Sequence, residues 1–422
     1  MSEQPQASIP GRNDDWGQTL ATYRLLNNPR VTPRAVQQPA IARTRRRCGE
    51  RRVVLCVHDL TELKPVRRMS DTKLLQHTCL AVDGDNGEVL GLLHQHWFDD
   101  PKKPKGESRS KRRQRWTRSQ SWLDAVEAVG EASGSFRLIS VADTEADDFG
   151  MFAACQEMGH GFVIRSQHDR RLVDGGHLRE TVLQMPVAGR TTAAVAHRSA
   201  VGVKAPPRKR RPTRKPREAN LAIRFGRVTL GTPRGDPRHT HPREVCVVHV
   251  REEQPPADGG EPIDWLLLTS EPVTTLADAL RVLGWYRRRW LIEEFHKAQK
   301  TGCRLEESQL QEPDAFVTLA AIASVVAVRL LNLRHQAEPS EHSDEPAMRW
   351  FDALWVLVVC KLAKHPDPST LTVRQFYHTI AKKGGWLARR SDGRPGWQTL
   401  WRGWRKIAAY VAGVELVSPP LD

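Results

Sequence analysis

The spacing of apolar residues changes along the chain and divides it into three regions. In the first region, short apolar runs bounded by turn residues predict strands at 53–58, 77–82, 89–98, 136–142 and 162–166. Asn86-Gly87, between the second and third runs, is a typical hairpin turn. A helical period appears at 122–129 and 145–157. The first region therefore predicts a unit of mixed strands and helices.

The second region, about 172–270, has shorter alternating runs at 181–186, 220–225, 245–250 and 265–270, and it predicts a β-rich insertion. The third region has a helical period. It predicts helices at about 276–300 and 313–335, and further helices at 350–362 and 397–411. A short helix is also predicted at 16–27.

The order of these elements predicts an α/β fold, with a ribonuclease-H-like mixed sheet, helices, the β-rich insertion and a helical C-terminal domain. We expect a short N-terminal helical region at 1–45, a central ribonuclease-H-like domain at 46–336 that contains the insertion, and a helical domain at 347–422. A polar, Pro-containing linker at 337–346 precedes the last domain.

Basic residues outnumber acidic residues, 65 to 49, and give the 422-residue chain a formal net charge of +16. Such a surplus suits a polyanion, such as DNA, RNA or an anionic membrane surface. Two basic runs, at 102–118 and 204–217, predict either contacts with a DNA backbone or solvated loops. The longest apolar run, 316–331, is too short for a membrane span and contains Arg329. We therefore expect a buried helix there and no membrane partner.

Other classes of protein are disfavoured by the motifs that the sequence lacks. The seven cysteines are scattered and have no metal-ligand spacing, which indicates a reducing compartment and thiols that serve as small buried hydrophobes. No glycine-rich phosphate-binding motif precedes a helix, so we expect no nucleotide cofactor. The first residues contain no apolar signal-peptide core, and we expect a cytoplasmic location.

Two aspartates follow apolar runs directly: Asp59 after 53–58 and Asp143 after 136–142. A carboxylate at the end of such a strand faces the open edge of the sheet, where sites in α/β folds tend to lie. A single aspartate in this position is more commonly a turn or cap residue. The pair therefore favours a functional site only modestly.

The predicted helix at 276–300 places further polar groups along one face. At about 100° per residue, Tyr286, Arg289, Glu293 and Lys300 fall within an arc of roughly 60°, and Lys297 lies beside them. The opposite side is predicted to face the core through Leu280, Gly284, Leu291, Phe295 and Ala298. The alternative is a solvated face with ion pairs four residues apart, such as Arg289 with Glu293.

Three carboxylates that converge beside cations suit two Mg²⁺ ions, because hard divalent cations need several oxygen ligands. Two such ions about 3.5–4 Å apart can activate a water or a 3′-hydroxyl and stabilise the leaving oxygen of a phosphodiester. The flanking arginine and lysines would hold phosphates. Asp59, Asp143 and Glu293 are thus the candidate catalytic and metal-binding residues.

These residues carry a resemblance to a known family. Tyr286-x2-Arg289-x3-Glu293-x6-Lys300 is the YREK signature of DDE transposases of the fourth insertion-sequence family. Four segments resemble stretches of the hairpin-forming cut-and-paste transposases of bacterial resistance transposons: 91–97, 265–273, 292–302 and 401–404. The resemblance covers the chain from about residue 17 to residue 415.

The resemblance implies a role for each matching residue. Asp59, Asp143 and Glu293 match the catalytic triad, which binds two Mg²⁺ ions, with Mn²⁺ able to substitute. Tyr286, Arg289 and Lys300 match residues that grip the phosphate beside a base flipped out of the transposon end. Trp265 matches the tryptophan on which this base stacks, although by itself it reads as a core aromatic of a strand.

The function that the resemblance implies is DNA transposition, a form of DNA recombination, in the nucleoid of a bacterium. The enzyme would form a homodimer on paired transposon-end DNA, nick one strand, form and open a hairpin, and join the 3′ ends to target DNA. The domain at 347–422 would be the dimerisation domain. The helical spacing of its Trp397, Trp401 and Trp404 also fits simple core packing.

The chain departs from the family pattern at three places; the first two put only local details in doubt, and the third, the short N-terminus, leaves an alternative open. Thr144 and Phe149 stand where the family has an arginine and a histidine, and only 58 residues precede Asp59, which is fewer than in relatives. The alternative is an N-terminally shortened, non-catalytic DNA-binding repressor of transposition that acts through dimerisation.

Overall fold

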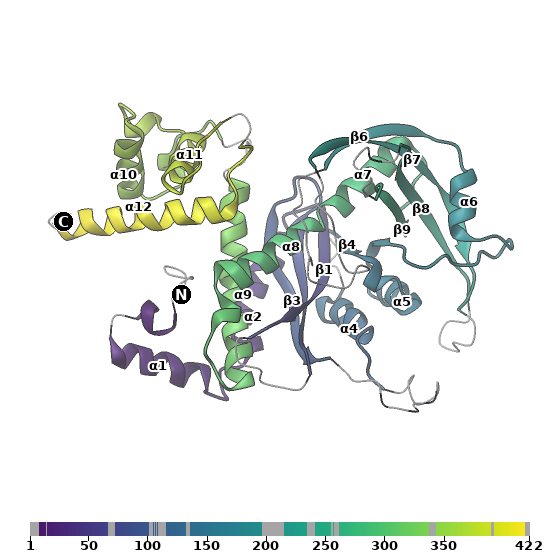
Figure 1. Ribbon diagram of the computed structural model, residues 1–422, viewed down its shortest axis with the longest axis horizontal. Coiled ribbons are helices and arrows are strands. Elements are labelled where there is room, and N and C mark those ends of the chain that lie inside the picture. The colour runs from purple at the N-terminus through teal and green to yellow at the C-terminus, as the bar shows by residue number, and fades with distance from the viewer. Residues whose placement is uncertain are drawn as a thin grey trace.

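The computed structural model describes residues 8–417 except 14, 66–71, 101–103, 105, 107, 109–114, 132–135, 196–214, 234–240, 255, 257–260, 337–342 and 390–391. Within these residues a nine-stranded sheet has the order β3-β2-β1-β4-β5-β9-β8-β7-β6 (Figure 1). Its strands are β1 (Val53–Leu63), β2 (Leu74–Asp83), β3 (Val89–Asp99), β4 (Arg137–Ala142), β5 (Gly161–Arg165), β6 (Gly189–Val195), β7 (Arg217–Leu230), β8 (Arg243–Glu252) and β9 (Asp264–Thr269). The two basic runs of the sequence lie largely outside the described residues.

The centre of the sheet is parallel and its flanks are antiparallel. β1 pairs with β4, and β4 with β5, in the parallel sense. β2 and β3 form a hairpin that pairs antiparallel to β1, and the turn between them closes with a bond from the Asp83 N–H to the Glu88 carbonyl. The mixed sheet and its Asn-Gly hairpin, both predicted from the sequence, are confirmed.

The β-rich segment extends this same sheet. β9 pairs antiparallel to β5, and β8, β7 and β6 follow in order across the sheet. The strand predicted at 181–186 is wrong, because residues 181–184 belong to helix α6 (Leu178–Gln184), which buries Leu178 and Val182 four residues apart. A short apolar run fits either period, and here burial of one helical face decides.

Helices cover both faces of the sheet (Figure 1). On one face, α4 (Gln120–Val129), α5 (Phe149–Glu157) and α6 pack against β4, β5 and the inserted strands. On the other face lie α7 (Leu276–Arg287), α8 (Trp290–Lys297) and α9 (Pro313–Gln336). α9 contains the long apolar run. Its stretch Pro313–Asn332 is long and apolar enough to cross a membrane, so the prediction that the run is too short for a span is wrong. However, 67% of its most apolar window is buried, as expected of a core helix. The seven cysteines are also free and buried, as predicted.

The single helix predicted at 276–300 is wrong. α7 ends at Arg287, α8 begins at Trp290, and a π-helix (η4, Ala298–Gly302) follows. α7 buries Trp285 and Tyr286, while Leu280 is 40% exposed. The predicted core face holds only in the second half, where Phe295 and Ala298 are buried.

Helices at both ends of the chain complete the structure. The N-terminal pair is α1 (Trp16–Leu26) and α2 (Pro33–Cys48); the sequence did not predict α2, because its basic composition and internal Pro39 obscure the helical period. The C-terminal helices α10 (Ala353–Ala363), α11 (Val373–Lys383) and α12 (Trp397–Val417) share an apolar core of their own. Trp397 and Trp401 of α12 instead join the main core beside α9.

Buried histidines lie on the sheet face that α4 covers. His77 on β2 is within 3.2 Å of the Ser121 hydroxyl on α4 and 3.4 Å of the His58 ring on β1. Burial lowers the pKa of His58 to about 3. Burial and the neighbouring His58 lower the pKa of His77 well below its ordinary value. Both rings are therefore neutral in the folded protein at ordinary pH.

This burial predicts acid sensitivity. The unfolded chain takes up protons on its histidines below about pH 6.5, whereas folded His58 does so only near pH 3. Its contribution to stability is therefore complete above about pH 6.5 and is lost as the pH falls, by up to about 1.4 kcal/mol per pH unit. We expect the unfolding free energy, measured with urea, to fall less between pH 7 and pH 5 in His58→Asn than in the wild type. The exposed control His241→Asn should keep the wild-type difference, and an unchanged difference in His58→Asn would contradict this account.

Candidate active site

The sheet places the two predicted aspartates on neighbouring strands. Val57 on β1 pairs with Val141 on β4, and Asp59 and Asp143 lie two residues further along their chains. Residues two apart in a strand share a face, so the backbone directs both carboxylates toward the side that carries α7 and α8. Asp59 is not at the end of its strand as predicted, because β1 continues to Leu63 alongside β2 after β4 has ended.

α8 brings a third carboxylate and an imidazole to Asp59. Glu293 lies in the first turn of α8, and His296 lies three residues later on the same helical face. The His296 Nδ1 is 3.3 Å from the Asp59 Oδ2. One ligand atom from each of Asp59, Glu293 and His296 lies within 4.8 Å of the others. Asp59 and His296 are buried and Glu293 is half-buried, so the cluster is open on the glutamate side.

Arg289 supplies the positive charge between the carboxylates. Its guanidinium is 3.6 Å from the Asp59 Oδ1 and 3.3 Å from the Glu293 Oε1. Burial opposes the charge of this guanidinium, but the carboxylates around it outweigh burial and raise the pKa of Arg289. Arg289 is therefore a fixed cation in a pocket where acidic groups would otherwise repel each other.

Asp143 lies at the edge of this cluster. Its Oδ1 accepts a bond of 2.9 Å from the Glu145 N–H and so caps the short helix η2 (Thr144–Ala146). Burial, and next the negative charge of Asp59, raise the pKa of Asp143. Asp143 is thus within electrostatic reach of Asp59, although it is not part of the close group formed by Asp59, Glu293 and His296.

Tyr286 and Trp265 lie against each other beside the carboxylates. Their ring centroids are 5.4 Å apart at 68°, an edge-to-face contact between α7 and β9. Tyr286 is only 6% exposed, and burial raises the pKa of its hydroxyl, while the positive charge of Arg289 opposes this shift. The sequence placed Tyr286 on the helix face opposite the core, but its side chain is buried. Trp265 is half-buried.

Lys300 is held by β1 and Lys297 is exposed. The Lys300 Nζ donates to the Thr61 Oγ1 at 2.8 Å and to the Glu62 carbonyl at 2.6 Å. Burial lowers the pKa of Lys300, and Glu306, at 3.8 Å, opposes this shift. The π-helix around Lys300 is a feature often found at functional sites. Lys300 thus binds the strand that carries Asp59.

His296 was not singled out from the sequence. Its only sequence signal is its place three residues after Glu293, which puts both residues on one helical face. The structure adds that His296 is 5% exposed and that its Nε2 has no hydrogen-bond partner among the described residues. This imidazole therefore belongs to the site by contact with Asp59.

Comparison with known protein families identifies the class. A model of the transposase DDE domain matches residues 103–329, more than half of the chain. A model of transposase DNA-binding domains matches residues 1–31, and a model of the transposase Tn5 dimerisation domain matches residues 347–418. The chain belongs to the DDE transposases, and its sheet and helices form the ribonuclease-H-like fold predicted from the sequence.

Among solved structures, the chain is similar to a piggyBac transposase, described in a cryo-EM structure of its synaptic complex with hairpin DNA. The identity is 7% and the TM-score is 0.31, and the match covers 88% of this chain and 55% of that chain. The present chain thus spans about half of the length of that transposase, and a likeness this weak carries no argument.

Membership of the family implies a divalent metal cofactor, and the residues present fit one. The two carboxylates and the imidazole offer oxygen and nitrogen ligands within 4.8 Å. The positive charge of Arg289 occupies the point where these acidic groups meet. Asp59 and Glu293, with Asp143 after β4, are the residues that would hold the metal, and His296 would orient the Asp59 carboxylate.

This arrangement predicts how metal affinity depends on each ligand. In calorimetric titrations with Mn²⁺, Glu293→Gln and Asp59→Asn should abolish measurable binding, because each removes a charged oxygen ligand. His296→Ala should weaken binding by about 10- to 100-fold, the usual effect of losing a group that orients a ligand. The neighbouring Glu294→Gln is the control and should bind Mn²⁺ as the wild type does. Wild-type affinity in His296→Ala would remove this imidazole from the site.

Proposed function

We propose that this protein is a Mg²⁺-dependent DNA transposase that cuts and joins transposon ends. The observation that carries the proposal is the meeting of Asp59, Glu293 and His296 beside Arg289, in a chain whose residues 103–329 match a transposase DDE domain. A structural ion pair would not need two carboxylates, an imidazole and a half-buried guanidinium at one partly open point. Such a group fits a site for metal and phosphate.

Each residue has a separate task in this proposal. Two Mg²⁺ ions held by Asp59, Asp143 and Glu293 would, when bound, activate a water or a 3′-hydroxyl and stabilise the leaving oxygen. Arg289 neutralises the carboxylates and is placed to hold a phosphate as a bidentate fork. Lys300 fixes the adjoining part of β1 through Thr61 and Glu62. His296 orients the Asp59 carboxylate through the 3.3 Å contact.

One such site suits a series of phosphoryl transfers. We infer that the enzyme nicks one strand at the transposon end, that the freed 3′-hydroxyl attacks the opposite strand to form a hairpin, and that the opened ends attack target DNA. The matches to a transposase DNA-binding domain and to a dimerisation domain support a homodimer on paired ends. A location in the bacterial cytoplasm, on the nucleoid, agrees with DNA as the substrate.

The alternative of a non-catalytic repressor is not favoured. A repressor needs DNA binding and dimerisation but gains nothing from an assembled cluster of carboxylates. Keeping such acidic groups together costs stability unless a cation or a metal compensates them. The cluster and its compensating Arg289 are both present in this chain.

The proposal predicts loss of cleavage without loss of binding. Asp59→Asn, Asp143→Asn and Glu293→Gln should each lower Mg²⁺-dependent cleavage of transposon-end DNA below detection, because each removes a metal ligand. Duplex binding in EDTA should stay within about twofold of the wild type. Cleavage is read on denaturing gels, and Glu294→Gln is the matched control that should still cleave. Cleavage near the wild-type rate in Glu293→Gln would refute the assignment.

Trp265 tests the base-flipping part of the proposal. Trp265→Ala removes the half-buried ring beside Tyr286, on which a flipped base could stack at a gain of about 1–3 kcal/mol. Nicking should survive this change better than hairpin formation, because only the second step bends a strand sharply. Strand-resolved gels separate the two products. Equal loss of nicking and hairpin formation would show that Trp265 is structural, and Trp265→Phe should restore the hairpin in part.

A further inference from the structure

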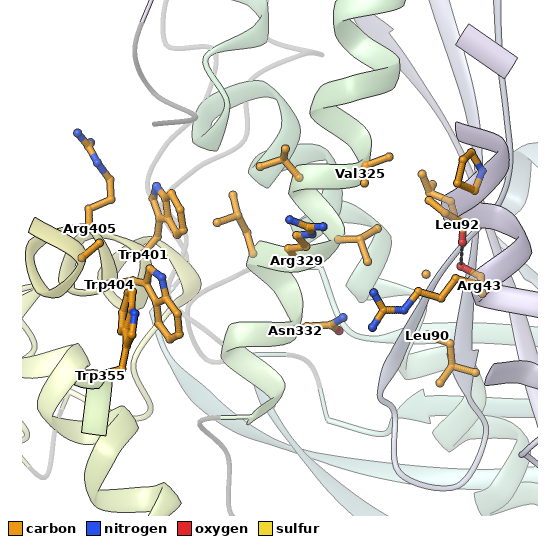
Figure 2. Close-up of a pocket in the computed structure, with 18 of the residues that line it drawn as sticks. Arg43, Leu90, Leu92, Val325, Arg329, Asn332, Trp355, Trp401, Trp404 and Arg405 are labelled. Atoms are coloured by element: carbon orange, nitrogen blue, oxygen red, sulfur yellow. Dashed lines mark hydrogen bonds between the residues drawn. The ribbon is translucent and has the colours of Figure 1, made fainter. Parts of the chain in front are cut away.

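A large groove lies between the sheet and the C-terminal helices, apart from the carboxylate site. It is lined by α2, the edge strand β3, α9, α10 and α12, and its volume is about 1260 Å³. Figure 2 shows Arg329 on α9 at its centre, with Trp401, Trp404 and Arg405 on one side and Arg43 on the other. None of Asp59, Asp143, Glu293 and His296 lines it. The groove is larger than the roughly 300–1,000 Å³ of a typical small-molecule site.

The charges on the groove are mostly positive. Four of its lining residues are arginines, and among the lining residues that the structure describes Glu415 is the acidic one. Arg47 is paired with Glu88. Arg43, Arg329 and Arg405 are exposed and make no ion pair or side-chain hydrogen bond within the described part of the chain. Three arginines from three different helices therefore converge on one concave surface without counter-charges.

The wall of the groove also contains an unused hydrogen-bond donor. Trp401 is 6% exposed, and its Nε1 is buried without a hydrogen-bond partner among the described residues. Trp355 and Trp404 pack together beside it with ring centroids 4.6 Å apart. Arginine forks donate and do not accept hydrogen bonds, so the three arginines match an anion. Thr44, Asn332 and Glu415, which also line the groove, carry acceptor oxygens, so the match to an anion rests on the arginines.

We propose that this groove binds the phosphate backbone of duplex DNA, at a second place on the protein away from the carboxylates. The inference rests on the proposed function, because it assumes that DNA is the substrate. The binding would be independent of base sequence, since arginine contacts to phosphates position a duplex without reading it. The groove joins the catalytic sheet to α10 and α12, so DNA bound there would hold the C-terminal helices against α9.

A second copy of this chain is the less favoured occupant. The dimerisation model covers α10 and α12, which line part of the groove. However, the chain has a net charge of +16, and a partner copy would bring further positive charge toward unpaired arginines. Charge complementarity therefore favours DNA.

The test measures binding of a fluorescein-labelled 30-base-pair duplex to the full chain in EDTA, so that catalysis does not enter. Arg43→Ala, Arg329→Ala and Arg405→Ala are compared with Arg46→Ala and Arg402→Ala. The last two remove the same charge from exposed positions on α2 and α12 that do not line the groove. Fluorescence anisotropy is recorded from 50 to 300 mM KCl, and sedimentation velocity without DNA reports the dimer.

Each groove variant should lower the slope of log K against log salt by about 0.9, the value for one lost phosphate contact. The two controls should change it by less than half of that, and Arg329→Lys should restore most of the slope. If the groove variants bind DNA as the wild type does, with the same salt slopes as the control variants, the groove is not a DNA-binding site. The proposed function would stay intact. Groove variants that weaken the dimer but not DNA binding would show a second copy as the occupant. Absence of wild-type DNA binding would overturn the proposed function itself.

Discussion

The site depends on neutralising the negative charge of acidic groups that lie close together in a partly buried place. Asp59 is buried, and Glu293 and Asp143 approach it from a helix and from the neighbouring strand. Acidic groups this close repel each other. Burial, and to a smaller extent the charge of Asp59, raise the pKa of Asp143. Arg289 offsets the repulsion by lying 3.6 Å from Asp59 and 3.3 Å from Glu293. Because one guanidinium does not neutralise three carboxylates, the negative charge that remains also favours binding of a divalent metal ion.

The fold meets this requirement through two local features. β1 extends beyond the end of β4, so that Asp59 is held by β2 while it faces the helices. α7 and α8 meet at Arg288 and Arg289, and Arg289 precedes the first turn of α8 beside Asp59 and Glu293. Tyr286, in the last turn of α7, packs edge to face against Trp265. The junction of the two helices thus places the carboxylate site next to this aromatic contact.

Much of this could be predicted from the sequence, because apolar runs and the YREK spacing are local signals. The central strands, the Asn-Gly hairpin and α9 follow from period and turn chemistry, and Asp59 and Glu293 follow from their motifs. Three features could not be predicted in this way. The break after Arg287 has no Pro or Gly to mark it, α2 contains Pro39 in a basic segment, and residues 181–186 fit either period. His296 was missed because its role depends on Asp59, which lies more than two hundred residues earlier.

The central claim is that Asp59, Asp143 and Glu293 form one metal site, and diffraction from a crystal soaked in Mn²⁺ tests it most directly. Anomalous difference maps locate manganese without reference to activity. The account predicts peaks with ligand distances near 2.1–2.2 Å to carboxylate oxygens of Asp59 and Glu293, with Asp143 as a further ligand, and about 3.5–4 Å between two ions where both are bound. Manganese at other positions only, with Arg289 still paired to Asp59 and Glu293, would contradict the account.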